Sequence, residues 1–172
     1  MLERAHRAYY RVWQFSQAVR AAVTPEEITL VSDMLTGPEQ DLFKAMPLVD
    51  QRHCLDVFYT LRRCSCEDKV VLKAALLHDA GKSYNGRTMR LSERVVVVLL
   101  DAVWTGIVVL LASAKPNSSR YGFYLHANHE RLGADLLSRA GSEPGVITLV
   151  SEHERPVLDS RSLLLHRADE EN

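Results

Sequence analysis

Cysteine is scarce in this sequence, with three residues among 172. An odd number of cysteines, together with the lack of a cleavable signal pattern at the start, predicts reduced thiols and a cytoplasmic location. Cys64 and Cys66 are separated by one residue, a spacing that can hold a soft metal. The sequence has no second cysteine pair to complete a four-ligand zinc site, so we interpret all three as ordinary thiols.

An excess of charge of either sign is also missing. Lys and Arg total 21 and Asp and Glu total 22, for a formal net charge of -1. Proteins that bind a nucleic-acid backbone by releasing its counterions need a strong basic field, so a long nucleic acid is not an expected partner. The contents of 47% hydrophobic and 25% charged residues are ordinary for a globular protein, and the length fits one domain.

Patterns typical of β-sheets and of internal repeats are absent as well. Apolar residues instead recur three and four positions apart, which is the period of an α-helix with one buried face. Thr24-Pro25-Glu26-Glu27 places a capping hydroxyl, a proline and two acids where a helix begins. The fold class predicted is all-α, a compact multi-helix bundle. Helices are expected at about 2–23, 25–36, 37–46, 48–63, 68–81, 95–112, 121–140, 145–153 and 160–172, with a loop at 82–90 that ends the fifth helix at a left-handed Gly81.

Residues 95–112 are the most apolar part of the chain. The stretch begins with four valines, which favour strands, but it contains no turn signal and exceeds the roughly 8 residues of an ordinary strand. A helix is therefore predicted. The alternative is membrane contact through 95–112, but a span needs about 20 apolar residues and Asp101 would lie near its middle. We prefer a buried core helix or a contact within a homodimer.

Histidine and aspartate residues recur at the predicted helices and their ends. Taken singly, His53, His126 or Asp169 fits an ordinary hydrogen-bonded or solvated side chain. The pair His78-Asp79 differs because it follows the apolar run at 74–77. A charged aspartate at the end of a buried helix is costly, and it also faces the negative end of the helix dipole. A cation beside Asp79 would remove both penalties, so the pair predicts a metal site.

The run Ala75-Leu76-Leu77-His78-Asp79-Ala80-Gly81-Lys82 follows an Arg52-His53 pair and precedes a distant Asp169. This arrangement resembles the HD-domain superfamily of metal-dependent phosphohydrolases, as a small stand-alone bacterial-type member. The likeness covers residues 51–169. It implies an all-helical fold and a divalent ion (Mn, Mg, Co, Ni, Fe or Zn) held by His53, His78, Asp79 and Asp169. Residues 1–46 precede the match and are predicted to pack as N-terminal helices on a core at 47–172, within a single compact domain.

Some members of the superfamily bind a second ion through further histidines. His129 lies four residues before a glycine, which matches one of their patterns. Another pattern is a His-His-Glu run, and here Glu152-His153-Glu154 stands in its place. Glutamate can ligate a metal but changes the charge and reach of the site, so we favour one ion and keep His129, His153 and Glu152 as ligands of a second. His126 is interpreted as a contact to substrate or to a ligand, with a plain helix-surface histidine as the alternative.

The resemblance implies hydrolysis of a small phosphate ester, and a nucleotide is the substrate class that we expect. A divalent ion lowers the pKa of bound water toward about 7, and Asp79 can orient that water or accept its proton. Lys82 and Arg52 are the candidates for balancing phosphate charge, with a solvated lysine and a surface salt bridge as the alternatives. A rival function is a metal-stabilised helical module that binds a nucleotide or a protein partner without turnover.

Overall fold

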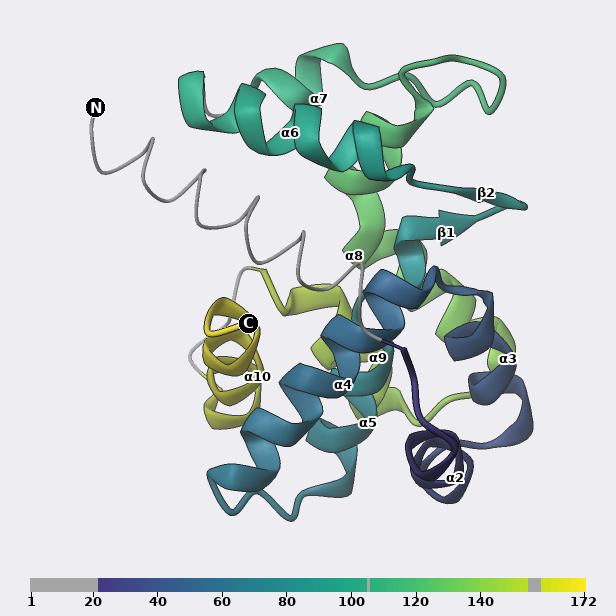
Figure 1. Ribbon diagram of the computed structural model, residues 1–172, viewed down its shortest axis with the longest axis vertical. Coiled ribbons are helices and arrows are strands. Elements are labelled where there is room, and N and C mark those ends of the chain that lie inside the picture. The colour runs from purple at the N-terminus through teal and green to yellow at the C-terminus, as the bar shows by residue number, and fades with distance from the viewer. Residues whose placement is uncertain (1–21, 105, 155–158) are drawn as a thin grey trace.

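The computed structural model describes residues 22–104, 106–154 and 159–172 (Figure 1). The helix predicted at 2–23 lies outside the described residues up to position 21, and residues 22 and 23 are not helical. Helices make up most of the described chain, which confirms the predicted all-α class.

Two short helices, α2 (Pro25–Met34) and α3 (Gly37–Ala45), open the described chain. The predicted cap at Thr24 is present: its hydroxyl accepts the backbone N–H of Glu27 at 3.3 Å, and the Glu27 carboxylate accepts the backbone N–H of Thr24 at 2.8 Å. This reciprocal pair satisfies two donors that the first turn leaves unpaired. Val31 and Phe43 then turn one face of each helix into the main core.

The main core lies between α4 (Leu48–Arg63), α5 (Lys69–Leu77), α9 (Pro144–Glu152) and α10 (Ser160–Glu170). Most of α5 is apolar, and its side chains from Val71 to Leu77, apart from Lys73, are buried. Such a helix is apolar almost all round because other helices cover it on several sides. Figure 1 shows α4 in front of α5, with α10 on one side and α9 behind. The end of α5 therefore lies deep in the molecule.

The segment after α5 differs from the prediction. The helix ends at Leu77 rather than at Gly81, and a 3-10 turn, η1 (Ala80–Lys82), follows. Strands β1 (Ser83–Tyr84) and β2 (Arg87–Thr88) then form an antiparallel hairpin where a loop was expected. Asn85 and Gly86 both have positive φ, at 51° and 70°, as a two-residue hairpin turn requires.

The single helix predicted at 95–112 is wrong, because two helices occupy the stretch. They are α6 (Leu91–Val103) and α7 (Ile107–Leu111), and Gly106 between them has φ +88°, a conformation that breaks a helix. Val97 and Val108 pack with α8 (Tyr121–Ala140) in a second, smaller core. No described helix is long and apolar enough to cross a bilayer.

A buried acid ties α3 to the main core. Glu39 is 0% exposed, and its Oε2 atom accepts hydrogen bonds from the backbone N–H of Thr36 at 2.9 Å and from its hydroxyl at 3.0 Å. Lys73 of α5 places its Nζ atom 3.7 Å from Glu39 and 3.1 Å from the exposed Glu143. Burial disfavours the Glu39 carboxylate, yet Thr36, Ser142 and Lys73 together lower its pKa below the ordinary value. The ionised form of Glu39 therefore stabilises the fold.

Glu39→Gln is expected to lower the free energy of unfolding at pH 7 by about 1–3 kcal/mol, because a buried charge-assisted network loses its anion. A lowered folded pKa gives stability that is present above the unfolded pKa and is lost as pH falls through the folded pKa. The difference between variant and wild type should therefore shrink below about pH 4. Urea denaturation at pH 7 and pH 3.5 measures both. Glu143→Gln is the control, expected to cost under about 1 kcal/mol, and equal curves for Glu39→Gln and wild type would contradict the network.

Candidate metal centre

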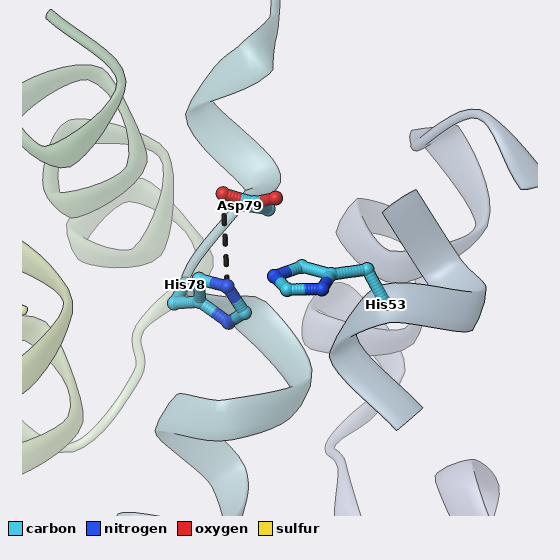
Figure 2. Close-up of side chains that lie close together, drawn as sticks. All are labelled: His53, His78 and Asp79. Atoms are coloured by element: carbon cyan, nitrogen blue, oxygen red, sulfur yellow. Dashed lines mark ion pairs between the residues drawn. The ribbon is translucent and has the colours of Figure 1, made fainter. Parts of the chain in front are cut away.

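Six side chains predicted as ligands reach one region from five parts of the fold. They come from α4, from the ends of α5 and α9, from α8 and from α10, and they are His53, His78, Asp79, His129, His153 and Asp169. Figure 2 shows His53 pointing across from α4 toward His78 and Asp79 at the end of α5. The helices that build the core thus bring together residues up to 116 positions apart in the sequence.

The first group of donors is centred on His78. Its Nε2 atom lies 3.5 Å from Oδ1 of Asp169 and 3.7 Å from Oδ1 of Asp79. The Nε2 atom of His53 lies 2.8 Å from the same Asp169 oxygen. Donors that surround one ion at about 2.0–2.2 Å stand roughly 3–3.5 Å apart, so this spacing suits a shared cation.

A second group shares Asp79 and adds two histidines. The Nε2 atom of His129 lies 3.3 Å from Nε2 of His153 and 3.9 Å from Oδ1 of Asp79. All three residues are buried, and their donor atoms lie within 4.8 Å of one another. Asp79 therefore belongs to both groups, and a third set of donors, His78, His153 and Asp169, overlaps with each of them.

The histidines present lone pairs to these groups. In each of three rings the Nδ1 atom donates to the backbone carbonyl three residues earlier, which fixes the proton on Nδ1 because a carbonyl oxygen only accepts. The pairs are His78 with Ala75 at 2.9 Å, His129 with His126 at 2.6 Å and His153 with Val150 at 2.9 Å. Metal-binding histidines are oriented in this way. The Nε2 atom of His78 is buried and has no hydrogen-bond partner among the described residues. Buried polar atoms nearly always have a partner, so a metal ligand role would account for this one.

The pKa values of the cluster follow from burial and from the charges packed together. Burial and the nearby Lys82 charge hold the pKa of His129 well below its ordinary value, and burial and His78 lower the pKa of His153 to about 4. Burial disfavours the Asp79 carboxylate, but Lys82 and His78 hold its pKa well below normal. Burial also disfavours the His78 cation, yet Cys54, Asp79 and Asp169 raise the pKa of His78 well above its ordinary value. A proton on His78 thus supplies positive charge that a metal ion would otherwise bring.

The two basic residues predicted to face substrate lie in different places. Lys82 follows η1, and its Nζ atom lies 2.7 Å from Oδ2 of Asp79. Arg52 pairs instead with Glu27 at 2.6 Å and with Asp56 at 2.9 Å, so it joins α4 to α2. Adjacent residues on a helix point about 100° apart, and Arg52 therefore does not follow His53 into the cluster.

Of the other two residues predicted for the site, His126 lies beside the cluster, and Glu152 has no described contact with it. The ring of His126 stacks on that of His129, with centroids 5.9 Å apart. Glu152 is half-buried at the end of α9, and none of the described contacts joins it to either donor group. Glu154 was not predicted, yet its Oε1 atom lies 3.4 Å from Nε2 of His129. The Glu-His-Glu run was visible in the sequence, but the direction of the chain after α9 decides which glutamate reaches the site.

His166 was also missed. Its Nδ1 atom donates to the backbone carbonyl of His153 at 2.8 Å, across the gap between α9 and α10. This bond links the helix that carries Asp169 to the segment that carries His153. Its position three residues before Asp169 is the one sequence signal that could have indicated it, since such residues lie near each other on a helix.

The contact between η1 and α8 explains a glycine in the predicted motif. A Cβ atom on Gly81 would lie 2.0 Å from the backbone oxygen of His129 and 2.5 Å from the backbone nitrogen of Gly133. The two backbones therefore touch at this point, and only glycine allows the approach. This contact sets Asp79 and Lys82 beside His129.

The comparison with known families agrees with this geometry. The model of the HD domain family matches residues 51–171, which is well over half of the chain. No curated protein and no solved structure matches the chain. HD domains bind divalent metals, and the family consists in general of metal-dependent hydrolases. The matched range begins just before His53 and ends just after Asp169, so it contains every residue of the two donor groups. The chain therefore belongs to the HD domain family.

Proposed function

We propose that this protein is a metal-dependent phosphohydrolase that acts on a small phosphate ester, with a nucleotide as the substrate class. One observation carries the proposal: the Nε2 atoms of His78, His129 and His153, whose Nδ1 atoms donate to backbone carbonyls, converge with carboxylate oxygens on one buried space. Such a set of acceptors repels itself unless protons or a bound cation supply positive charge. A divalent ion fits this need. The imidazole donors suit Zn, Fe or Ni, and the carboxylate donors suit Mg or Mn.

We assign the first ion to His53, His78, Asp79 and Asp169. The second group, formed by Asp79, His129 and His153, supports a second ion, although one ion was favoured from the sequence. Asp79 is common to both groups, so its carboxylate would be available to an ion held by either of them.

The chemistry of the site divides between the ion and the chain. A divalent ion lowers the pKa of bound water toward about 7 and polarises a phosphoryl oxygen. Asp79 holds a negative charge against the ion and orients the attacking water. Lys82 keeps a positive charge 2.7 Å from Asp79, where it can pair with a phosphate oxygen as charge develops there. His126, stacked on His129, is proposed to contact the substrate.

A screen of the purified protein tests the proposal. Nucleotides and a generic phosphatase substrate are incubated with Mn, Mg, Co, Ni, Fe and Zn in turn, and released phosphate is measured. Turnover with at least one of these metals and none in chelator is expected. Nucleotide binding without turnover under every metal would instead favour the rival function, a metal-stabilised module that binds a nucleotide or a protein partner.

Lys82→Met separates phosphate recognition from metal binding. We expect kcat/KM to fall by about 10²-fold, because one preorganised charge beside the reacting group is lost. The metal content should stay unchanged because the Lys82 ammonium is not a ligand. Arg52→Met is the matched control, expected to keep kcat/KM within a few-fold since Arg52 pairs with Glu27 and Asp56. The opposite ranking of the two variants would reverse these roles.

A further inference from the structure

Glu154 lies at the solvent edge of the second donor group. Its Oε1 atom is 3.4 Å from Nε2 of His129, whose side chain is 2% exposed, while the Glu154 side chain is 49% exposed. The backbone N–H of Glu154 donates to Oε1 of Glu130 at 2.9 Å, which fixes this point of the chain against α8. The backbone of Glu154 is therefore held against α8, and its carboxylate lies at the edge of the second group.

A hydrogen bond donated by His129 does not explain the approach of Glu154. The proton of His129 is on Nδ1, where it is donated to a backbone carbonyl, so Nε2 carries a lone pair. A lone pair and a carboxylate oxygen repel each other at 3.4 Å. Two donors bound to one ion at about 2.0–2.2 Å with a tetrahedral angle between them stand roughly 3.4 Å apart, which is the spacing observed.

The charge of the second group also leaves room for another acid. Its single carboxylate, Asp79, is shared with the first group and already pairs with Lys82. Its other two members, His129 and His153, are neutral ligands. A divalent ion there would lack a carboxylate of its own. Glu154 can supply one beside Nε2 of His129, whereas Glu130 lies 4.0 Å from Nδ1 of His153, the edge of that ring that faces a backbone carbonyl.

We infer that Glu154 is the fourth protein ligand of the second ion and that it marks the side on which that ion opens to substrate. The inference rests on the proposed function, since it needs metal binding by the two groups. The buried Asp79, His129 and His153 close the inner side of the ion. The exposure of Glu154 leaves the outer side accessible.

Two glutamates that flank His153 provide a matched test. Glu154→Gln and Glu152→Gln remove the same charge two residues apart, and only Glu154 contacts a donor group among the described residues. The full chain is loaded with Mn²⁺, dialysed and measured for metal content by mass spectrometry, and Mn²⁺ binding is followed by titration calorimetry. We expect about two ions per chain for wild type and Glu152→Gln. For Glu154→Gln we expect the weaker site to lose at least about tenfold in affinity, and the content to fall toward one.

The outcomes separate this inference from the function on which it rests. Wild-type protein that binds no divalent ion would overturn both. Two ions in wild type with the same affinities in Glu154→Gln, or a single ion in wild type, would overturn the role of Glu154 and leave the proposed hydrolase standing. The thermal midpoint of the metal-free variants shows whether they fold, and it should match wild type closely because a half-exposed side chain is changed.

Discussion

Asp79→Asn is expected to abolish binding at both donor groups and to lower kcat/KM by at least about 10³-fold, equivalent to roughly 4 kcal/mol of transition-state stabilisation. Asp79 contributes its carboxylate both to the set with His53 and His78 and to the set with His129 and His153. Asparagine keeps the shape of the side chain but removes the charge. The loss should therefore exceed that of a His53 or His129 variant, each of which leaves two of the three possible sets of donors complete.

Metal content and phosphate release are measured on the same preparation of Asp79→Asn. Asp56→Asn is the matched control because Asp56 pairs with Arg52 on α4 and its side chain is 46% exposed. That variant should bind metal and turn over like wild type. A metal-loaded Asp79→Asn protein with full activity would show that the mechanism is wrong.

The part of the site that the sequence predicts is the part where a charged residue falls in a buried position, because such a residue is stable there in few surroundings. His78-Asp79 follows a run of buried side chains, and a carboxylate in that position requires a cation, so the prediction needed no knowledge of the partners. The bounds predicted for α4 and α8 are those observed, because a proline precedes one helix and a left-handed Gly141 ends the other.

Other features depended on information that the local sequence does not contain. The break between α6 and α7 rests on one glycine within an apolar stretch, a signal too weak to outweigh the uninterrupted hydrophobic pattern. Arg52 neighbours a donor in the sequence but pairs with Glu27 and Asp56, because adjacent helical residues diverge by about 100°. Glu152 also neighbours a donor, and none of its described contacts reaches either donor group. Glu154 reaches the site because the chain turns after α9. At that turn the backbone N–H of Glu154 donates to the Glu130 carboxylate of α8.

Gly81→Ala is expected to lower the free energy of unfolding by at least about 3 kcal/mol. A Cβ atom at this position would lie 2.0 Å from the backbone oxygen of His129, and backbone atoms cannot turn aside as a side chain can. Inserting one carbon into a packed core usually costs about 1–3 kcal/mol, and here a whole 3-10 turn must move away from α8. Gly37→Ala is the control, since nothing lies within 4 Å of its Cβ position, and it should be neutral or stabilising by up to about 1 kcal/mol.

Gly81→Ala should also weaken metal binding at the second group in protein that is still folded. η1 holds Lys82 and follows Asp79 directly, whereas His129 lies on α8, so moving the two backbones apart lengthens the 3.9 Å separation between Asp79 and His129. The first group lies on the other side of Asp79 and draws on α4, α5 and α10 instead. Folded Gly81→Ala protein should therefore lose the second ion preferentially, measured as metal content below the unfolding midpoint. Wild-type stability together with two bound ions would mean that the contact between η1 and α8 does not position this site.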